Sequence, residues 1–267
     1  MEYEPLIYLR VNRVPPELCA RARAVSVADL HENTGHLAYT GLMTSAIHRV
    51  TPGTVVGPAV TALCRAGDNL MAHRALSLAQ PGDVLVVVCQ GESAGAVWGD
   101  LATRFAQARG VSGVIVQGCV RDVDAVAALG FPVWASDVSP AHADKGKLGA
   151  VNVPIVCGGV RVHPGDLVAA DGDGVLVVER RHAERVVAGA EIKMRREEDV
   201  ARRIEQGEML WNLTGSAQAF ELLGATEVDA AYEDPTWSAL PLTATQSASR
   251  PTAAPAPQPQ QRTRETK

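Results

Sequence analysis

The architecture of this chain is set by residues 83–122, which read DVLVVVCQGESAGAVWGDLATRFAQARGVSGVIVQGCVRD. Two runs of branched apolar residues, Asp83–Cys89 and Gly113–Gln117, predict buried β-strands. Between them, Ala94–Arg109 has apolar residues at helical spacing and ends at Gly110, which predicts a helix. A strand, a helix and a strand in this order form a β-α-β unit, in which the two strands lie parallel in one sheet.

The alternation continues on both sides of this unit. Thr54–Cys64 is rich in β-branched residues and predicts a strand before it. After it, Val123–Leu129 predicts a short helix that stops at Gly130, and Pro132–Ala135 predicts a short strand. The later part of the sequence predicts a run of strands at Val153–Val162, Asp166–Ala170 and Val175–Val178. A long charged helix is predicted after them, at Arg180–Gln206. The predicted fold class is therefore α/β, a layered domain with a mixed sheet.

Composition narrows the class of function. The formal net charge is −5 over 267 residues, whereas a nucleic-acid-binding surface shows clustered lysines and arginines. No apolar stretch approaches the roughly 20 residues needed to span a membrane, and the N-terminus lacks the pattern of a secretory signal. The five cysteines show no C-x-x-C spacing, so neither a zinc site nor a redox pair is indicated. Their odd number and apolar neighbours favour reduced, mostly buried thiols in a cytoplasmic protein. We expect a cytoplasmic enzyme that acts on a small molecule, without nucleic-acid or membrane partners.

Gly91–Ala102, GESAGAVWGDLA, is the first candidate binding segment. Its small residues allow a ligand to approach the backbone, and free amides near the start of a helix suit an anion. The P-loop and dinucleotide glycine patterns are both missing, which disfavours a nucleotide. The alternative is a glycine-rich turn without a ligand. Ser93 also fits the G-x-S-x-G pattern of esterases, with His142 and His163 as available partners, but a single match to so short a pattern is weak.

Gly118–Asp122 is the second candidate, because it follows a buried strand and ligands gather at the carboxyl ends of strands in α/β sheets. Arg121 offers a planar set of donors for a carboxylate or an enolate. Asp122 offers the hard oxygen ligands that Mg²⁺ or Mn²⁺ prefers. The alternative is that Asp122 caps the next helix while Arg121 makes a surface ion pair.

Two acidic segments complete the candidates. Glu197, Glu198 and Asp199 lie in the long charged helix, and one of them could reach a metal across a subunit interface. The alternative, which the sequence alone favours, is a solvated helix face with i,i+4 ion pairs to nearby arginines. Asp171–Gly174 resembles part of a calcium-binding loop but lacks the downstream glutamate, so a tight turn is the better interpretation.

Several ordered blocks resemble the RraA-like family, which includes the class II pyruvate aldolases. The resemblance runs from about Val25 to Gly224. Its blocks are VVGPAVTALCRAGDNLMAH (55–73), QPGDVLVVV (80–88), AVWGDLATRFAQARGVSGVIVQGCVRDVDAVAALGFPVWA (96–135) and GKLGAVNVPIVCGGVRVHPGDLVAADGDGVLVV (146–178). The stretches AGDNLMAH and LGAVNVPIVCGG are most similar to the branch that acts on 4-carboxy-4-hydroxy-2-oxoadipate and 4-hydroxy-4-methyl-2-oxoglutarate.

The resemblance implies a swivelling β/β/α fold and a homotrimer or homohexamer. It implies an N-terminal extension at residues 1–24 and a domain with a C-terminal helical arm at residues 25–234. Residues 235–267, rich in proline and alanine, predict a disordered tail. The implied activity is a divalent-metal-dependent aldolase, with Mg²⁺ or Mn²⁺, that releases pyruvate and also decarboxylates oxaloacetate.

The resemblance also assigns roles to residues. It implies that the loop of Gly99, Asp100, Leu101 and Ala102 binds the pyruvyl carboxylate through backbone amides. Arg121 contacts the substrate and stabilises the enolate, and Asp122 ligates the metal. Glu197 of the adjacent subunit lies near the metal waters, with Glu198 as the alternative if the alignment has a one-residue gap.

The family includes other activities, and this sequence departs from the family's sequence pattern at two places. Some RraA-like proteins regulate a ribonuclease complex without catalysis, but the presence of Arg121, Asp122 and a candidate glutamate favours the enzyme. A methyltransferase is disfavoured because no glycine loop for S-adenosylmethionine is recognisable. Residues 209–224 (MLWNLTGSAQAFELLG) depart from the aldolase pattern, so the preference for the distal part of the substrate stays open. Gln117 stands where many relatives have Asp, before the catalytic pair, and is expected to tune the site without removing it.

Overall fold

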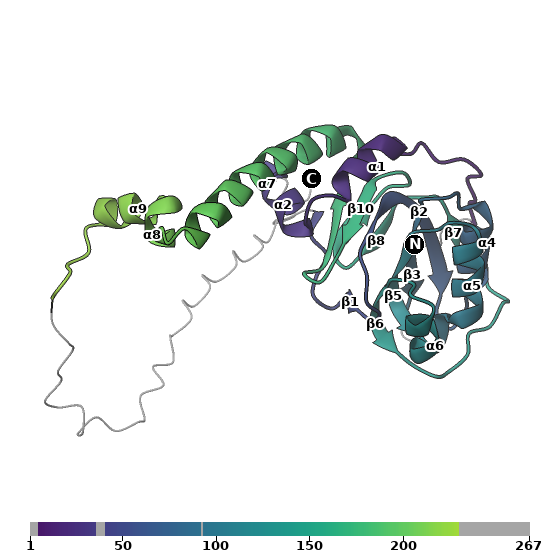
Figure 1. Ribbon diagram of the computed structural model, residues 1–267. Coiled ribbons are helices and arrows are strands. Elements are labelled where there is room, and N and C mark those ends of the chain that lie inside the picture. The colour runs from purple at the N-terminus through teal and green to yellow at the C-terminus, as the bar shows by residue number, and fades with distance from the viewer. Residues whose placement is uncertain (1–4, 36–40, 92, 230–267) are drawn as a thin grey trace, which may run out of the picture. The chain divides into compact units, whose positions relative to one another are not determined.

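The computed structural model describes residues 5–35, 41–91 and 93–229 (Figure 1). The chain divides into two units, residues 1–213 and 214–267. The first unit contains a nine-stranded sheet with the order β1-β6-β5-β3-β2-β10-β11, with β4 beside β5 and β7 beside β2. Its strands pair in both directions, so the prediction of a mixed sheet is confirmed. In the second unit helix α9 spans Ser216–Leu223, and the predicted disordered tail lies outside the described residues.

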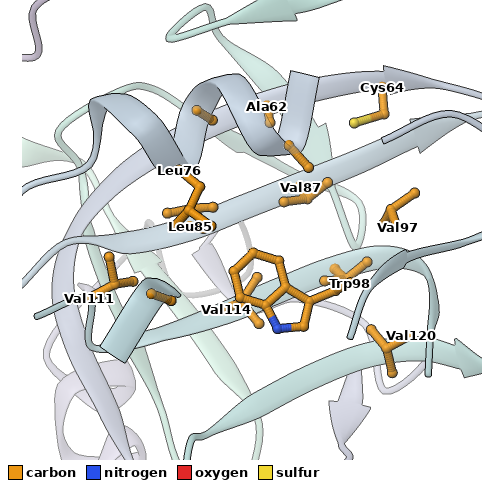
Figure 2. Packing of buried hydrophobic residues seen from close by; sticks show 14 of the residues in the cluster. Ala62, Cys64, Leu76, Leu85, Val87, Val97, Trp98, Val111, Val114 and Val120 are labelled. Atoms are coloured by element: carbon orange, nitrogen blue, oxygen red, sulfur yellow. The ribbon is translucent and has the colours of Figure 1, made fainter. Parts of the chain in front are cut away.

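The centre of the sheet is parallel. Four neighbouring strands run in the same direction, namely β2 (Val55–Arg65), β3 (Val84–Gln90), β5 (Gly113–Val120) and β6 (Val133–Val138). Three helices connect them in turn, namely α4 (Leu70–Leu78), α5 (Asp100–Ala108) and α6 (Val123–Ala128). Apolar side chains of these strands and helices form one buried cluster that contains Leu76, Leu85 and Val114 (Figure 2). The predicted β-α-β unit is therefore the middle of this parallel layer.

The predicted helix at Ala94–Arg109 is wrong in its first part. Ala96–Trp98 forms strand β4, which pairs in parallel with β5, and helix α5 begins only at Asp100. All three residues of β4 are buried. Three buried residues in succession point in different directions around a helix and cannot share one face, whereas a strand between other elements buries both of its faces.

Among the later strands, β10 and β11 extend the nine-stranded sheet beyond β2, whereas β8 and β9 form a separate two-stranded sheet whose apolar residues pack with those of β3. The predicted strand Val153–Val162 is a hairpin of two strands, because Gly158 and Gly159 have φ of +55° and +80° and turn the chain. The turn at Asp171–Gly174 is confirmed, with the Asp173 amide donating to Asp171 Oδ1 at 2.9 Å. The strands of this region and the first edge strand are β1 (His48–Arg49), β7 (Ala150–Val151), β8 (Ile155–Cys157), β9 (Val160–Val162), β10 (Leu167–Ala170) and β11 (Val175–Val178).

A third layer of helices packs on β10 and β11. It consists of α1 (Pro16–Ala22), α2 (Val27–Glu32) and α7 (Ala183–Glu205), with the short η2 (Arg180–His182) before α7 and α8 (Leu210–Leu213) after it. Leu18, Leu30 and Val186 are buried together there. Only the first half of α7 is buried, up to Ala190. Among the described residues, no helix combines the length and the apolar character that crossing a bilayer requires.

Candidate functional site

The two candidate segments lie side by side. Gly99 connects β4 to α5, and Arg121 and Asp122 connect β5 to α6. Since β4 and β5 are parallel partners, their carboxyl ends meet at the same edge of the sheet. The Arg121 amide donates to the Trp98 carbonyl at 3.0 Å and ties the two loops together.

Asp122 has an unusual backbone conformation. Its φ of 56° and ψ of 34° lie in the left-handed region, which aspartate adopts more readily than most residues. The partly exposed ion pair of Arg121 that the alternative predicted is present. Asp122 is the N-cap residue of α6, but its carboxylate makes no capping hydrogen bond, so the capping part of the alternative is wrong. Instead, Asp122 Oδ2 accepts the Asp100 amide of the neighbouring helix at 3.2 Å and lies 3.3 Å from Arg121 Nε. The left-handed turn therefore brings the carboxylate to the start of α5.

Gly99 allows this approach. A Cβ at position 99 would lie 2.5 Å from Asp122 Oδ2 and 3.2 Å from Arg121 Cγ. At the start of α5, the Asp100 amide is used by Asp122 and the Thr103 amide by the Gly99 carbonyl. No acceptor for the Leu101 and Ala102 amides is found in residues 5–35, 41–91 or 93–229. Two donors at a helix N-terminus thus remain available to an anion.

The floor of the site is rigid. The Trp98 indole Nε1 donates to Thr103 Oγ1 at 2.9 Å, and this hydroxyl donates to the Gly99 carbonyl at 2.9 Å. The Trp98 ring stacks on Phe131 with ring centroids 6.2 Å apart. Both aromatic side chains are buried. Local packing therefore holds in place Gly99 and the first turn of α5, which carries the free amides.

These elements enclose a pocket of about 150 Å³. A cavity of about this volume can bind a ligand of six heavy atoms such as benzene. The pocket is lined by Gly99, Asp100, Leu101, Ala102, Arg121 and Asp122, together with Trp98, Asn69, His73, His142 and Lys145. Of the last four, His142 was considered from the sequence only as a partner of Ser93 in an esterase, and the other three were not predicted, although the block AGDNLMAH contains Asn69 and His73. The pocket thus joins the predicted residues to a second set of polar side chains.

Asp68 positions this second set. Its buried carboxylate accepts the Leu70 amide at 2.9 Å, the Gly146 amide at 2.6 Å and the Lys147 amide at 2.9 Å. Burial alone would raise the pKa of Asp68, but the three hydrogen bonds outweigh it and lower the pKa. The loop that carries Lys145 is thereby attached to the start of α4.

The charge of Lys145 also affects the acidity of a histidine that lines the pocket. Burial, together with the nearby Lys145 ammonium, lowers the pKa of His73. His142 lies beside the pocket with its Nε2 3.2 Å from Asp144 Oδ1. This half of the pocket is therefore cationic when Lys145 is charged, which suits an anionic group on a ligand.

Asp68→Asn is expected to lower the free energy of unfolding by about 1–3 kcal/mol near pH 7, because an amide nitrogen would face backbone N–H donors. The folded pKa lies below the ordinary value of 3.8. The stabilisation is therefore complete above that value and is lost as the pH falls through the folded pKa. Urea unfolding at about pH 7 and about pH 3 measures this difference. Asp144→Asn, at an exposed neighbouring carboxylate, is the control, and a wild-type-to-Asp68→Asn gap that stays constant with pH would contradict the assignment.

Glu197 does not line the pocket of its own chain. It lies on the exposed half of α7 and pairs with Lys193, which also contacts Asp29 at 2.8 Å and Glu32 at 3.3 Å. Within one chain this helix face therefore shows an i,i+4 ion pair, as the alternative predicted, although the partner is a lysine and not an arginine. A role of Glu197 in a neighbouring subunit stays a prediction, as does the same role for Glu198.

The esterase alternative loses its structural basis. Ser93 lies in the loop before β4, with no helix directly after it. Its hydroxyl accepts the Gly95 amide at 3.0 Å, and no histidine contact with this hydroxyl occurs in the described part of the chain. His163 instead lies 3.3 Å from Asp166. The geometry of a nucleophile elbow is therefore not formed at Ser93.

The residues of the pocket fit a hydrated divalent cation. Asp100 and Asp122 both line it, and Mg²⁺ is usually bound by one or two carboxylates, several waters and the substrate. The described residues contain no group of three or more histidine, cysteine, aspartate or glutamate side chains able to surround a metal. The donor set therefore suits Mg²⁺ or Mn²⁺ better than a closed zinc site.

Comparison with known proteins extends these observations. Residues 27–177 match the family model described as RraA-like: Aldolase/RraA. A protein of Halalkalibacterium halodurans named "Putative 4-hydroxy-4-methyl-2-oxoglutarate aldolase" is 39% identical over 155 residues, which cover 58% of this chain and 74% of that protein.

Two solved structures share the fold. An uncharacterized protein from Pseudomonas syringae has a TM-score of 0.69 and 27% identity, covering 78% of this chain and 97% of that one. Streptomyces coelicolor RraAS2, described as an unusual member of the RNase ES inhibitor RraA protein family, has a TM-score of 0.64 and 33% identity. The match covers 72% of this chain and 100% of RraAS2. One fold thus carries both an aldolase name and an inhibitor name, so function must be argued from the site.

Proposed function

Because this chain belongs to the RraA-like family, we propose that it is a divalent-metal-dependent aldolase that cleaves 4-hydroxy-2-oxo acids to pyruvate and a second keto acid. Candidate substrates are 4-hydroxy-4-methyl-2-oxoglutarate and 4-carboxy-4-hydroxy-2-oxoadipate, with oxaloacetate decarboxylation as a side activity. The main support is that Arg121, Asp122 and the free amides of α5 line one pocket. These are the groups that a bond cleavage leaving charge on a keto acid requires.

The residues have complementary tasks. The amides of Leu101 and Ala102 bind the substrate carboxylate and orient the bond to be broken before the reaction. The Arg121 guanidinium, which is 40% exposed, stabilises the negative charge that develops on the neighbouring keto oxygen. Asp122, assisted by Asp100, would hold Mg²⁺ or Mn²⁺, which when bound supplies Lewis-acid stabilisation of the same charge. Decarboxylation of oxaloacetate yields the same pyruvyl charge, so one site serves both reactions.

The test is pyruvate formation from a panel of 4-hydroxy-2-oxo acids and oxaloacetate, with and without Mg²⁺. We expect turnover that needs the divalent cation, is lost on adding a chelator and returns with excess metal. Undiminished turnover after complete removal of divalent cations would overturn the class II assignment. The panel also ranks the substrates, because the pyruvyl half is common to all of them.

The second candidate function is regulation of a ribonuclease without catalysis. It is favoured by the likeness to RraAS2, a member of an RNase inhibitor family. A regulator has no need to keep Arg121, Asp122 and two free amides around one pocket. Recovery of a ribonuclease or helicase in a pull-down, together with no pyruvate formation from any substrate of the panel, would reverse the ranking.

We further propose that the site is completed in a homotrimer or homohexamer, where Glu197 of the partner subunit holds a water that accepts the C4 hydroxyl proton. Support comes from the exposed second half of α7, where Glu197 lies outside the pocket of its own chain. Co-folding Arg121→Ala chains with Glu197→Gln chains is expected to restore about a quarter of the sites if the subunits mix at random in a cyclic assembly. If the mixture of the two inactive variants stayed inactive, all catalytic groups would have to come from one chain.

Lys145→Ala is expected to raise the KM for a substrate with a carboxylate on its leaving half about tenfold, since a charge-assisted contact is lost. Inhibition by pyruvate, which lacks that half, should be unchanged. Lys147→Ala is the matched control, because its ammonium donates to the Ala66 carbonyl at 2.8 Å and does not line the pocket. Equal effects of Lys145→Ala on KM and on pyruvate inhibition would contradict a distal role.

A further inference from the structure

Two of the five cysteines are direct neighbours in the sheet. Cys64 on β2 and Cys89 on β3 are in-register partners of the parallel ladder. Neighbouring strands lie about 4.8 Å apart, which falls within the separation of about 4.4–6.8 Å that a disulfide allows between Cα atoms. In-register residues also point to the same face of the sheet. The two sulfurs can therefore be joined without moving either strand.

The two thiols differ in accessibility. Cys64 is fully buried in the cluster that Figure 2 shows, beneath α4. Cys89 is only partly buried and lines an open pocket of about 680 Å³ that also contains Cys119. Gly118 leaves room for it, since a Cβ there would lie 2.9 Å from Cys89 Sγ. A small solute can thus reach Cys89 but not Cys64.

The thiols also differ in acidity. A hydrogen bond from the Cys64 thiol to the Cys89 sulfur, reinforced by burial, raises the pKa of Cys64. Accepting this hydrogen bond lowers the pKa of Cys89, against the opposing effect of its burial. Reactive cysteines combine thiolate character with exposure, and redox-sensitive ones commonly lie next to a second cysteine. The more exposed member of this pair is therefore the more nucleophilic one.

We propose that Cys64 and Cys89 form a dithiol that a hydroperoxide oxidises to an intramolecular disulfide across β2 and β3. The Cys89 thiolate attacks hydrogen peroxide and becomes a sulfenic acid, while the O–O bond breaks and one water is released after protonation. The Cys64 sulfur then attacks the sulfenic sulfur, and its proton leaves with the hydroxyl group as a second water. Two thiols and one peroxide give one disulfide and two waters, so atoms and electrons balance.

Cys119 is the competing partner, because it lines the same pocket. Its thiol donates to the Ser93 carbonyl at 3.6 Å, and burial raises its pKa. It is not a ladder partner of Cys89, which pairs with Cys64. The geometry therefore favours Cys64 as the second cysteine of the disulfide.

The three cysteines lie on separate tryptic peptides, 50–65, 75–104 and 110–121. The folded full-length chain is treated with hydrogen peroxide, alkylated and mapped without reduction. We expect a cross-link between peptides 50–65 and 75–104, loss of two of the five alkylatable thiols and full recovery with dithiothreitol. A cross-link between 75–104 and 110–121, or oxidation of Cys89 to the sulfinic acid without any cross-link, would overturn the proposal.

Cysteine-to-alanine variants test which cysteines form the disulfide, although the peptide map of the wild-type chain is decisive alone. Cys64→Ala should abolish the cross-link and leave Cys89 as a trappable sulfenic acid. Cys119→Ala and Cys157→Ala should both retain the cross-link, and Cys157 is a suitable control because it is buried in another cluster. If Cys64→Ala retained a cross-link to Cys89, the assignment of Cys64 would be wrong.

Discussion

Asp122→Asn is expected to lower kcat/KM for pyruvate formation by about 10²–10³-fold, the effect typical of removing one group that stabilises charge in a transition state. Asparagine has the same shape and accepts the left-handed backbone that position 122 requires. It can also still accept the Asp100 amide, which now donates to Oδ2 at 3.2 Å. The substitution therefore removes the negative charge and replaces an anionic oxygen ligand for a divalent cation with a weaker neutral one, while the loop keeps its conformation.

The matched control is Asp124→Asn. Asp124 lies two residues further on, in the first turn of α6, and does not line the pocket. We expect wild-type turnover for Asp124→Asn and wild-type urea midpoints for both variants. Steady-state rates over a range of Mg²⁺ concentrations measure the effect. If Asp122→Asn kept full turnover at the same Mg²⁺ requirement, Asp122 could not be the metal ligand.

The parallel centre of the fold could be predicted from the sequence because each of its strands is buried on both faces. Residues 84–88 and 113–116 are continuous apolar runs, and such runs have few alternatives. Strand β4 could not be separated from α5, because three apolar residues fit both periodicities until their burial is known. Helix α4 was also missed, although its buried residues Met71, Ala72, Ala75 and Leu76 recur at the spacing of one helix face. Its existence depends on packing against β2 and β3.

The site was predictable only where the motif is local. Arg121 and Asp122 adjoin each other, and Gly99–Ala102 forms the start of one helix, so both segments could be found one at a time. Asp68 and Lys145 are far apart in sequence, and long-range hydrogen bonds between residues 67–69 and 144–147 bring their segments together. Such long-range contacts have no periodicity to reveal them, and a buried carboxylate looks like any other aspartate in a sequence.

Gly99→Ala is expected to lower kcat/KM about 10²-fold, as small misplacements of catalytic groups do, with little change in stability. Position 99 has φ of −164° and ψ of −162°, an extended backbone open to any residue. The added Cβ would lie 2.5 Å from Asp122 Oδ2, so the carboxylate must rotate away. It would then lose its hydrogen bond from the Asp100 amide and its contact with Arg121.

Gly172→Ala is the matched control, because a Cβ there makes only an ordinary contact, 3.4 Å from Arg49, in a turn remote from the pocket. We expect it to keep wild-type rates. Titration of Mg²⁺ in the Gly99→Ala variant separates two causes of a lower rate. A displaced Asp122 raises the Mg²⁺ concentration needed for half-maximal turnover, whereas general damage to the fold lowers the urea midpoint. Wild-type turnover and Mg²⁺ requirement in Gly99→Ala would show that the contact between Gly99 and the Asp122 carboxylate has no part in catalysis.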